Sequence, residues 1–149
     1  MITLTKKCQL KINQAVDCQL YLTSEERRKA KQKIKIDTND KPSEEYIKLD
    51  LVRGSILEEG DILTNDTEDF FVEIKAKLEP VITVKSPDVL TLLKVAYHLG
   101  NRHISLEISR DYLRFSPDHV LESMLVKLGV NLEQEIVAFY PESGAYKHH

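Results

Sequence analysis

Two copies of one short pattern, both in the second half of the chain, limit the possible folds more than any other feature. The tripeptide Ser-Pro-Asp stands at 86–88 and again at 116–118, and a Leu-Gly pair follows each copy, at 99–100 and 128–129. A serine N-cap, a proline at the first helical position and a nearby acid are typical of a helix start, and glycine is typical of the position just after a helix. The pattern predicts a first helix over about 87 to 99, with Gly100 beyond it, and a second helix ending at Gly129.

Apolar residues recur at helical spacing in both predicted helices, and short strands are predicted around them at 81–85, 104–109, 112–115 and about 130–138. This order of elements is β-α-β-β-α-β, the ferredoxin-like split arrangement. The predicted core stripes comprise Val89, Leu92, Leu93, Ala96 and Leu99 in the first helix and Val120, Leu121, Met124, Leu125 and Leu128 in the second.

The first 80 residues show a different pattern, in which apolar residues alternate in short runs separated by turn residues. Short strands with tight turns and no helical period indicate a small β-sandwich or open barrel. The chain is thus predicted to be α+β, with a β-rich domain at 1–80, a ferredoxin-like domain at 81–140 and a mobile tail at 141–149, where no apolar pattern remains. The predicted strands of the first domain include Ile2 and Leu4; Cys8, Leu10 and Ile12; Cys18, Leu20 and Leu22; and residues 29–36, 47–51, 62–63 and 71–78.

The composition is that of a soluble globular protein, with 42% hydrophobic and 30% charged residues and a net charge of −3. No apolar run approaches the roughly 18 residues of a membrane span, and the amino terminus lacks the apolar core of a secretory signal. We therefore expect a cytoplasmic protein that does not enter a membrane. Cys8 and Cys18 match neither a disulfide framework nor a zinc pattern, and we interpret both as buried thiols.

The common catalytic and nucleotide-binding motifs are missing from the sequence. It contains no Gly-x-Ser-x-Gly elbow, no His-Glu-x-x-His, no P-loop and no Gly-x-Gly-x-x-Gly. A small hydrolase would have no nucleophile to name, so we do not expect an enzyme.

Histidines are crowded into the last third of the chain. His98 falls in the last turn of the first predicted helix, where an imidazolium would interact favourably with the helix dipole and the free carbonyls; this structural role and metal binding are both open for it. His119 stands in the first turn of the second helix, where an exposed structural residue is the simpler interpretation. The five histidines are His98, His103, His119, His148 and His149.

His103 lies beyond Gly100, so the turn after the helix sets its direction. One exposed histidine holds a transition metal poorly, but on a two-fold axis His103 would meet its copy from a second protomer and supply two imidazoles to one site. Imidazole is a suitable ligand for nickel, copper and zinc. The predicted mobile tail ends in His148 and His149, which could complete such a site.

The alternative function is nucleic-acid binding by the β-α-β-β-α-β domain. Lysines alternate along residues 29 to 35 and would form a basic stripe on one strand face, and Tyr112 and Phe115 could stack on bases. The basic-Gly-aromatic signature of RNA-binding modules is missing, however, and the net charge is negative. A solvated strand face is the simpler interpretation of the lysines.

Residues 96–103 read Ala-Tyr-His-Leu-Gly-Asn-Arg-His and are followed by a strand, by Leu-Arg-Phe at 113–115 and by Asp-His-Val-Leu at 118–121. This series resembles the UreE family of urease accessory proteins, the nickel metallochaperones, and Gly-Asn-Arg-His is its most specific mark. The resemblance spans the chain, because residues 22–27 and 60–63 are similar to the family's amino-terminal domain, and Gly-Ala-Tyr at 144–146 is similar to the start of its histidine-rich end.

The resemblance implies a homodimer, formed through the ferredoxin-like domains, that carries Ni(II) to the urease apoprotein and works with a partner GTPase. It implies that His103 is the principal metal ligand at the dimer centre and that His148 and His149 join it. Gly100, Asn101 and Arg102 would be structural residues around this site. The amino-terminal domain would bind peptides or partners.

The sequence departs from the family pattern in two places. His119 matches a secondary histidine of some relatives, but Pro117 stands where they carry another histidine, which argues against a separate surface copper site. The short tail argues against storage of several nickel ions.

The donor set also predicts how the site would behave. Neutral imidazoles without a thiolate or a buried carboxylate should bind Ni(II) moderately and release it to a better-liganded acceptor, and Zn(II) or Cu(II) could substitute. Because imidazole binds a metal only when deprotonated, affinity should fall as the pH drops through about 6.5.

Overall fold

A computed structural model of the chain describes residues 1–38 and 41–143. The chain divides into two compact units, the first Met1–Ala76 and the second beginning at Lys77. Each unit has its own apolar core, so each is described by itself. The architecture is mixed α+β, as predicted, with most elements being strands.

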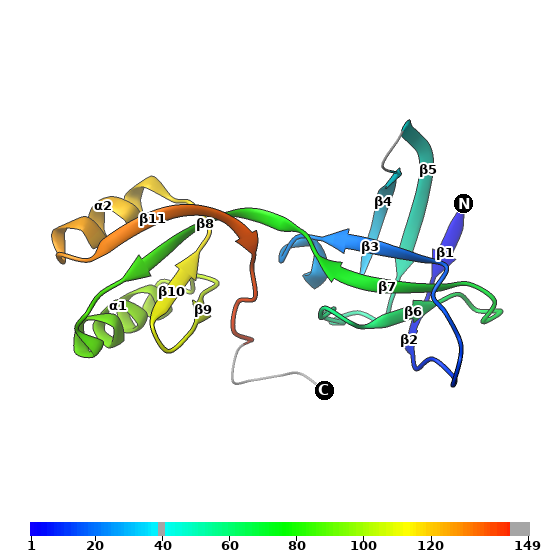
Figure 1. Cartoon of the computed structure of the whole chain (residues 1–149), viewed down its shortest axis with the longest axis horizontal. Helices are drawn as coiled ribbons and strands as arrows, with labels where there is room; N and C mark the ends of the chain where they lie inside the picture. Colours follow the sequence, from blue (N-terminus) through cyan, green and yellow to red (C-terminus); the bar gives the residue numbers. More distant parts are fainter. Residues whose placement is uncertain (39–40, 144–149) are drawn as a thin grey trace. The chain divides into compact units, whose positions relative to one another are not determined.

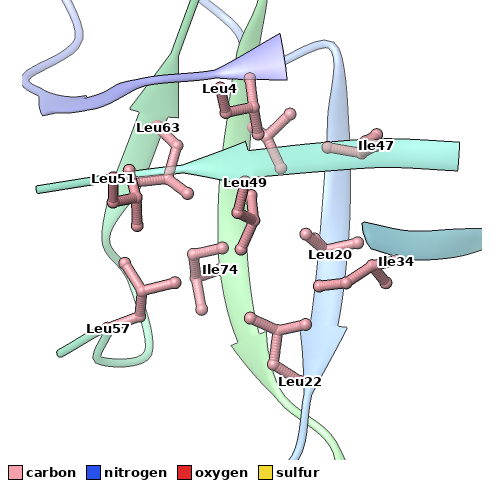
Figure 2. Close-up of a cluster of buried hydrophobic side chains, with 11 residues drawn as sticks. Leu4, Leu20, Leu22, Ile34, Ile47, Leu49, Leu51, Leu57, Leu63 and Ile74 are labelled. Carbon is pink, nitrogen blue, oxygen red and sulfur yellow. The ribbon is translucent and has the colours of Figure 1, made fainter. Parts of the chain in front are cut away.

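The first unit contains two sheets that share one core. Figure 2 shows leucine and isoleucine side chains from both sheets meeting in this core, including Leu4, Leu49 and Ile74, which are fully buried. One sheet has the strand order β1-β5-β4 and the other β2-β6-β7-β3. A short 3₁₀ helix, Glu26–Arg28, follows β3. The strands are β1 (Ile2–Leu4), β2 (Lys6–Cys8), β3 (Cys18–Leu22), β4 (Lys31–Thr38), β5 (Lys41–Asp50), β6 (Ile62–Thr64) and β7 (Phe71–Ala76).

Two details of the first unit differ from the predicted strands. The run from Cys8 to Ile12 is not one strand, because β2 ends at Cys8 and Ile12 is 94% exposed. The predicted strand at 71–78 ends at Ala76, and Leu78 already belongs to the next strand. By contrast, the predicted alternation in β4 is confirmed, since its lysines are exposed while Ile34 is buried.

The second unit is the predicted β-α-β-β-α-β arrangement (Figure 1). Its strands form one antiparallel sheet in the order β11-β8-β10-β9. Side chains from one face of this sheet, such as Val84 and Phe115, share a core with Leu99 and Leu125 from the two helices. The elements are β8 (Leu78–Lys85), α1 (Val89–Asn101), β9 (Glu107–Ile108), β10 (Tyr112–Phe115), α2 (His119–Lys127) and β11 (Asn131–Ala138).

Pro80 lies inside β8, where the sequence predicted a break before a strand at 81–85. A proline removes a backbone donor and is tolerated where a strand has a neighbour on one side only. β10 pairs with β8 only from Ile82 to Lys85, so β11 is the one paired neighbour at Pro80 within the described chain. The strand therefore continues through the proline.

The two helices begin later than predicted. Asp88 is the N-cap of α1 and accepts the N–H of Leu90, and Asp118 is the N-cap of α2 and accepts the N–H groups of Val120 and Leu121. The aspartates, rather than Ser86 and Ser116, cap the helices because a carboxylate two residues later can reach the free N–H groups of the first turn. Four residues assigned to the core stripes are instead exposed, namely Val89, Leu93, Val120 and Leu128.

Candidate metal centre

His103 occupies an unusual backbone position at the end of α1. Its φ angle is +56°, in the left-handed region that side chains other than glycine seldom adopt. The N–H of His103 donates to the carbonyl of Gly100 at 3.0 Å, and the N–H of Ile104 donates to the carbonyl of Leu99 at 3.2 Å. This pair of bonds is a Schellman motif, in which the left-handed residue directly follows the C-cap, here Arg102.

The prediction that Gly100 follows the helix is therefore wrong. Gly100 and Asn101 belong to the last helical turn, and His103 takes the left-handed place that glycine usually fills. Ile104 packs against the core of the second unit, which anchors the turn. The His103 side chain is exposed, so a rigid backbone turn presents an imidazole at the surface.

Of the other four predicted ligands, two lie at helix ends and two lie outside the described residues. His98 is exposed in the last turn of α1, and its ring lies edge-on to that of Tyr97, with 5.6 Å between the centroids. His119 is the first residue of α2 and is also exposed. His148 and His149 lie outside the described residues. Within 1–38 and 41–143, no three His, Cys, Asp or Glu side chains are grouped so that they could hold a metal ion.

The segment after β11 is a feature that sequence reasoning missed. Phe139 is fully buried, the N–H of Tyr140 donates to Glu107 Oε1 at 2.8 Å, and the N–H of Glu142 donates to the carbonyl of Leu106 at 2.8 Å. The chain thus turns away from β11 (Figure 1) and reaches the start of β9. Leu106 is only three positions after His103, so the tail departs from the same part of the second unit. No sequence pattern predicts this course, because both contacts join residues that are distant in the sequence.

A second missed feature is an apolar face on the outside of α1. Leu90, Leu93 and Tyr97 are 56%, 62% and 66% exposed. Their i, i+3, i+7 spacing puts them on one side of the helix, opposite the buried Leu92 and Leu99. A helix that is apolar on nearly every side is usually covered by protein on every side. The excess of apolar residues in α1 was the sequence signal that could have revealed this face.

The two cysteines take no part in the candidate site. Cys8 and Cys18 are free and only partly buried, which corrects the prediction of buried thiols. Burial is nevertheless the main cause that raises the pKa of each thiol, with nearby carboxylates adding to the effect. A raised pKa lowers the thiolate fraction, and the thiolate is the form that binds metals.

The aromatic residues proposed for base stacking are not available for it. Phe115 is fully buried. The guanidinium carbon of Arg114 lies 4.2 Å from the centroid of the Tyr112 ring, so a cation already covers that ring. Tyr112 and Phe115 are also three positions apart in β10, so their side chains face opposite sides of the strand.

The chain matches one protein family and several known proteins. Residues 79–149 match the family model described as "UreE urease accessory protein, C-terminal domain". Several relatives are named urease accessory protein UreE, and some of them match the whole chain. One from a Nostoc strain is 41% identical over 149 residues, which are 100% of this chain and 98% of the relative. One from Thermosynechococcus vestitus is 40% identical over 149 residues, 100% of both chains. One from Microcystis aeruginosa is 45% identical over 130 residues, 87% of this chain and 78% of the relative.

These matches define an accessory protein of urease rather than an enzyme. Within that class, the chain belongs to the UreE family. These matches to urease accessory proteins do not support the alternative function of nucleic-acid binding. No described helix is long and apolar enough to cross a membrane.

Proposed function

We propose that this protein is a cytoplasmic homodimeric nickel carrier that delivers Ni(II) for assembly of the urease metal centre. Its partners are the urease apoprotein and the urease accessory GTPase. The observation that carries the proposal is the exposed imidazole of His103, held by a Schellman turn at the end of a helix whose outer face is apolar.

The apolar face of α1 supports a dimer. Leu90, Leu93 and Tyr97 run along the helix toward the end that carries His103. Burying these side chains against their copies on a second protomer removes apolar area from water, which stabilises association by about 25 cal/mol per Å². A two-fold axis near this helix end brings the two His103 side chains together at one site. This symmetric pairing supplies the second imidazole, because a group of three ligands is lacking in the described part of one chain.

The course of the segment after β11 supports tail histidines as further ligands. His103 and Leu106 are three positions apart and lie within about 11 Å of each other, whereas Glu142 and His148 are six positions apart and can extend to about 21 Å. The bond between Glu142 and Leu106 therefore starts the tail within reach of His103. We propose His148 and His149 as ligands that complete the site, and His98 and His119 as secondary ligands at most.

The ligand chemistry fits transfer rather than storage. Neutral imidazoles at an exposed interface hold Ni(II) moderately and exchange it, and Zn(II) or Cu(II) can take its place. Protonation competes with the metal for imidazole, so acidification promotes release. Gly100, Asn101 and Arg102 serve to form the turn, and the first unit serves as the domain that docks peptides or partners.

Calorimetric titration with Ni(II) tests the metal site. We expect one ion per dimer in the unaltered protein and a loss of affinity of about 100-fold or more in His103→Ala, because one substitution removes two ligands from the shared site. Lys94→Ala is the matched control, since it removes an exposed side chain of the same helix that is not a proposed ligand. Unchanged affinity in His103→Ala, or one ion per monomer, would contradict the proposal.

Light scattering tests the dimer. Leu93→Lys puts a charge into the proposed interface and should shift the protein to monomers. Val126→Lys is the control, because Val126 is 62% exposed as well but lies on α2. A dimer that tolerates Leu93→Lys as well as it tolerates Val126→Lys would place the interface elsewhere.

A further inference from the structure

The three-stranded sheet of the first unit, β1-β5-β4, is strongly basic on the face that points away from the core. Lys33 of β4 lies directly opposite Lys48 of β5 in the sheet register, and both side chains are exposed. Lys35 is exposed as well, and Lys31 lies 3.8 Å from Asp50. We call these four lysines, at positions 31, 33, 35 and 48, the basic face.

The charges of the basic face are largely uncompensated. Lys33, Lys35 and Lys48 form no ion pair with the side chains that the structure describes. Like charges directly opposite each other on neighbouring strands destabilise a sheet. The chain as a whole has a net charge of −3, so the basic face is opposite in sign to the chain. Stability of the first unit therefore does not explain it.

Protection of the sheet edge explains only part of the basic face. β4 is an outer strand of its sheet (Figure 1), and lysines on an outer strand commonly prevent the sheets of two molecules from pairing. Lys48, however, lies on β5, the central strand, where no edge needs protection. Lysines on both strands are what a negatively charged ligand lying along this face requires.

The backbone of β4 favours a polypeptide as that ligand. From Lys31 to Lys35, β4 pairs with β5 without a register shift, and no described strand pairs with its other side. That side can form main-chain hydrogen bonds with an added strand, which neither a nucleic acid nor a lipid surface can do. An added strand would lie about 4.8 Å from β4.

The side chains of β4 indicate the sequence of such a strand. Side chains of an added strand alternate between its two faces. On one face they would lie beside the lysines of β4, and on the other beside Ile34 and Ile36, which belong to the apolar core of the first unit or pack against it. A segment with alternating acidic and apolar residues matches both faces.

We propose that β4 binds an extended segment of a partner protein in which acidic and apolar residues alternate, and that this segment joins the sheet as a further strand. Its carboxylates pair with the basic face. Tyr46, which lies opposite Lys35 and is 45% exposed, adds an aromatic contact of the kind enriched at interfaces. This inference rests on the proposed docking role of the first unit, and it adds the surface and the chemistry of the partner.

Lys48→Glu separates binding from stability. It turns the like pair with Lys33 into an ion pair, so the unfolding temperature should rise. It also puts a negative charge where the partner's carboxylates lie, so binding of an acidic segment should weaken about tenfold or more. A face that is merely exposed to water would show the gain in stability alone. Lys33→Gln removes one exposed ion pair and should weaken binding by up to about fivefold.

Fluorescence anisotropy of a labelled short peptide of alternating glutamate and valine, titrated with the full chain, tests the proposal. A peptide of the same composition with its glutamates grouped at one end tests strand addition, and an RNA oligonucleotide tests a nucleic-acid ligand. Lys11→Glu is the matched control for Lys48→Glu, because Lys11 is an exposed lysine of the first unit that lies on neither β4 nor β5. Lys33→Gln provides a result even if Lys48→Glu fails to fold.

We expect the alternating peptide to bind the unaltered protein and Lys11→Glu alike, to bind Lys33→Gln and Lys48→Glu more weakly, and to bind more tightly than the grouped peptide. Equal affinity for Lys48→Glu and Lys11→Glu, or no binding at all, would overturn the proposal. A grouped peptide that binds as tightly as the alternating one would overturn strand addition, and tighter binding of the RNA would overturn the choice of a polypeptide.

Two further measurements separate this inference from the proposed function. Lys48→Glu should leave the Ni(II) affinity unchanged, because the proposed metal ligands all lie outside the first unit. Retention of purified urease apoprotein by the unaltered protein measures docking itself. Retention that Lys48→Glu does not weaken would overturn the role of the basic face and leave the docking role in place. No retention by the unaltered protein would contradict the docking role and this inference with it.

Discussion

The ends of α1 and α2 differ although their sequences are alike. Both helices have an aspartate N-cap preceded by Ser-Pro, and both carry Leu-Gly near their carboxyl ends. In α2 the glycine, Gly129, has a φ angle of +79° and directly follows the C-cap. In α1 the glycine is inside the last turn, and the left-handed residue is His103 at +56°. A Leu-Gly pair therefore does not end both helices at the same position relative to the glycine.

The two helix ends also differ in backbone strain. A left-handed conformation costs a residue with a side chain roughly 1 to 2 kcal/mol, and glycine avoids this penalty. α2 has glycine at this position and therefore avoids the strain. α1 retains a histidine there, and strained backbone of this kind is typical of binding sites.

His103→Gly should make the end of α1 resemble that of α2. We expect Ni(II) affinity to fall about 100-fold because the ligand is lost, while the free energy of unfolding rises by about 0.5 to 1 kcal/mol because strain is relieved. Calorimetry measures the first effect and denaturant unfolding of the metal-free protein measures the second. A His103→Gly protein that is less stable than the original would show that the histidine itself stabilises the turn.

Gly129→Ala should introduce into α2 the strain that α1 tolerates. No atom lies within 4 Å of a Cβ placed at Gly129, so the expected destabilisation of about 1 kcal/mol would be conformational rather than steric. Denaturant unfolding measures it. Ni(II) affinity should not change, and a loss of affinity would show that the two helix ends are coupled.

Removal of the N-caps should affect both helices alike. Asp88→Ala and Asp118→Ala should each lower the free energy of unfolding by about 1 kcal/mol, because each carboxylate satisfies free N–H groups of the first turn. Thermal unfolding of the two variants gives the comparison. Clearly unequal losses would show that the two helix starts are less similar than their bonds indicate.

Local pattern was sufficient to predict the order of the elements in the second unit, although the strand predicted at 104–109 is only Glu107–Ile108. The strand at Tyr112–Phe115 is confirmed to the residue, because alternation and flanking turn residues are both local. The errors at Gly100 and Pro80 have a different origin. The number of turns a helix completes and the neighbours a strand has depend on tertiary packing, here of Ile104 on the core and of β11 along β8.

The sequence singled out His103 as a candidate ligand but gave no indication of the residues that surround it. His103 stood out in the sequence because it follows a helix-ending pattern. Glu107 gave no signal, since its partners Arg114 and Tyr140 are 7 and 33 positions away and no short motif links them. The sequence pattern predicted core positions for Val89 and Leu93, which are exposed, because helical spacing alone does not say which of two apolar faces is buried.

Gly100→Ala is the smallest change and the sharpest test of where α1 ends. If Gly100 were the left-handed residue after the helix, as the sequence pattern favours, alanine would destabilise the protein as it does at position 129. Because Gly100 is helical and no atom lies within 4 Å of an added Cβ, we expect alanine to stabilise the protein by about 0.5 kcal/mol through its better helix propensity. Urea unfolding of Gly100→Ala and Gly129→Ala side by side measures the sign directly. Destabilisation at both positions would contradict the different helix ends described for α1 and α2.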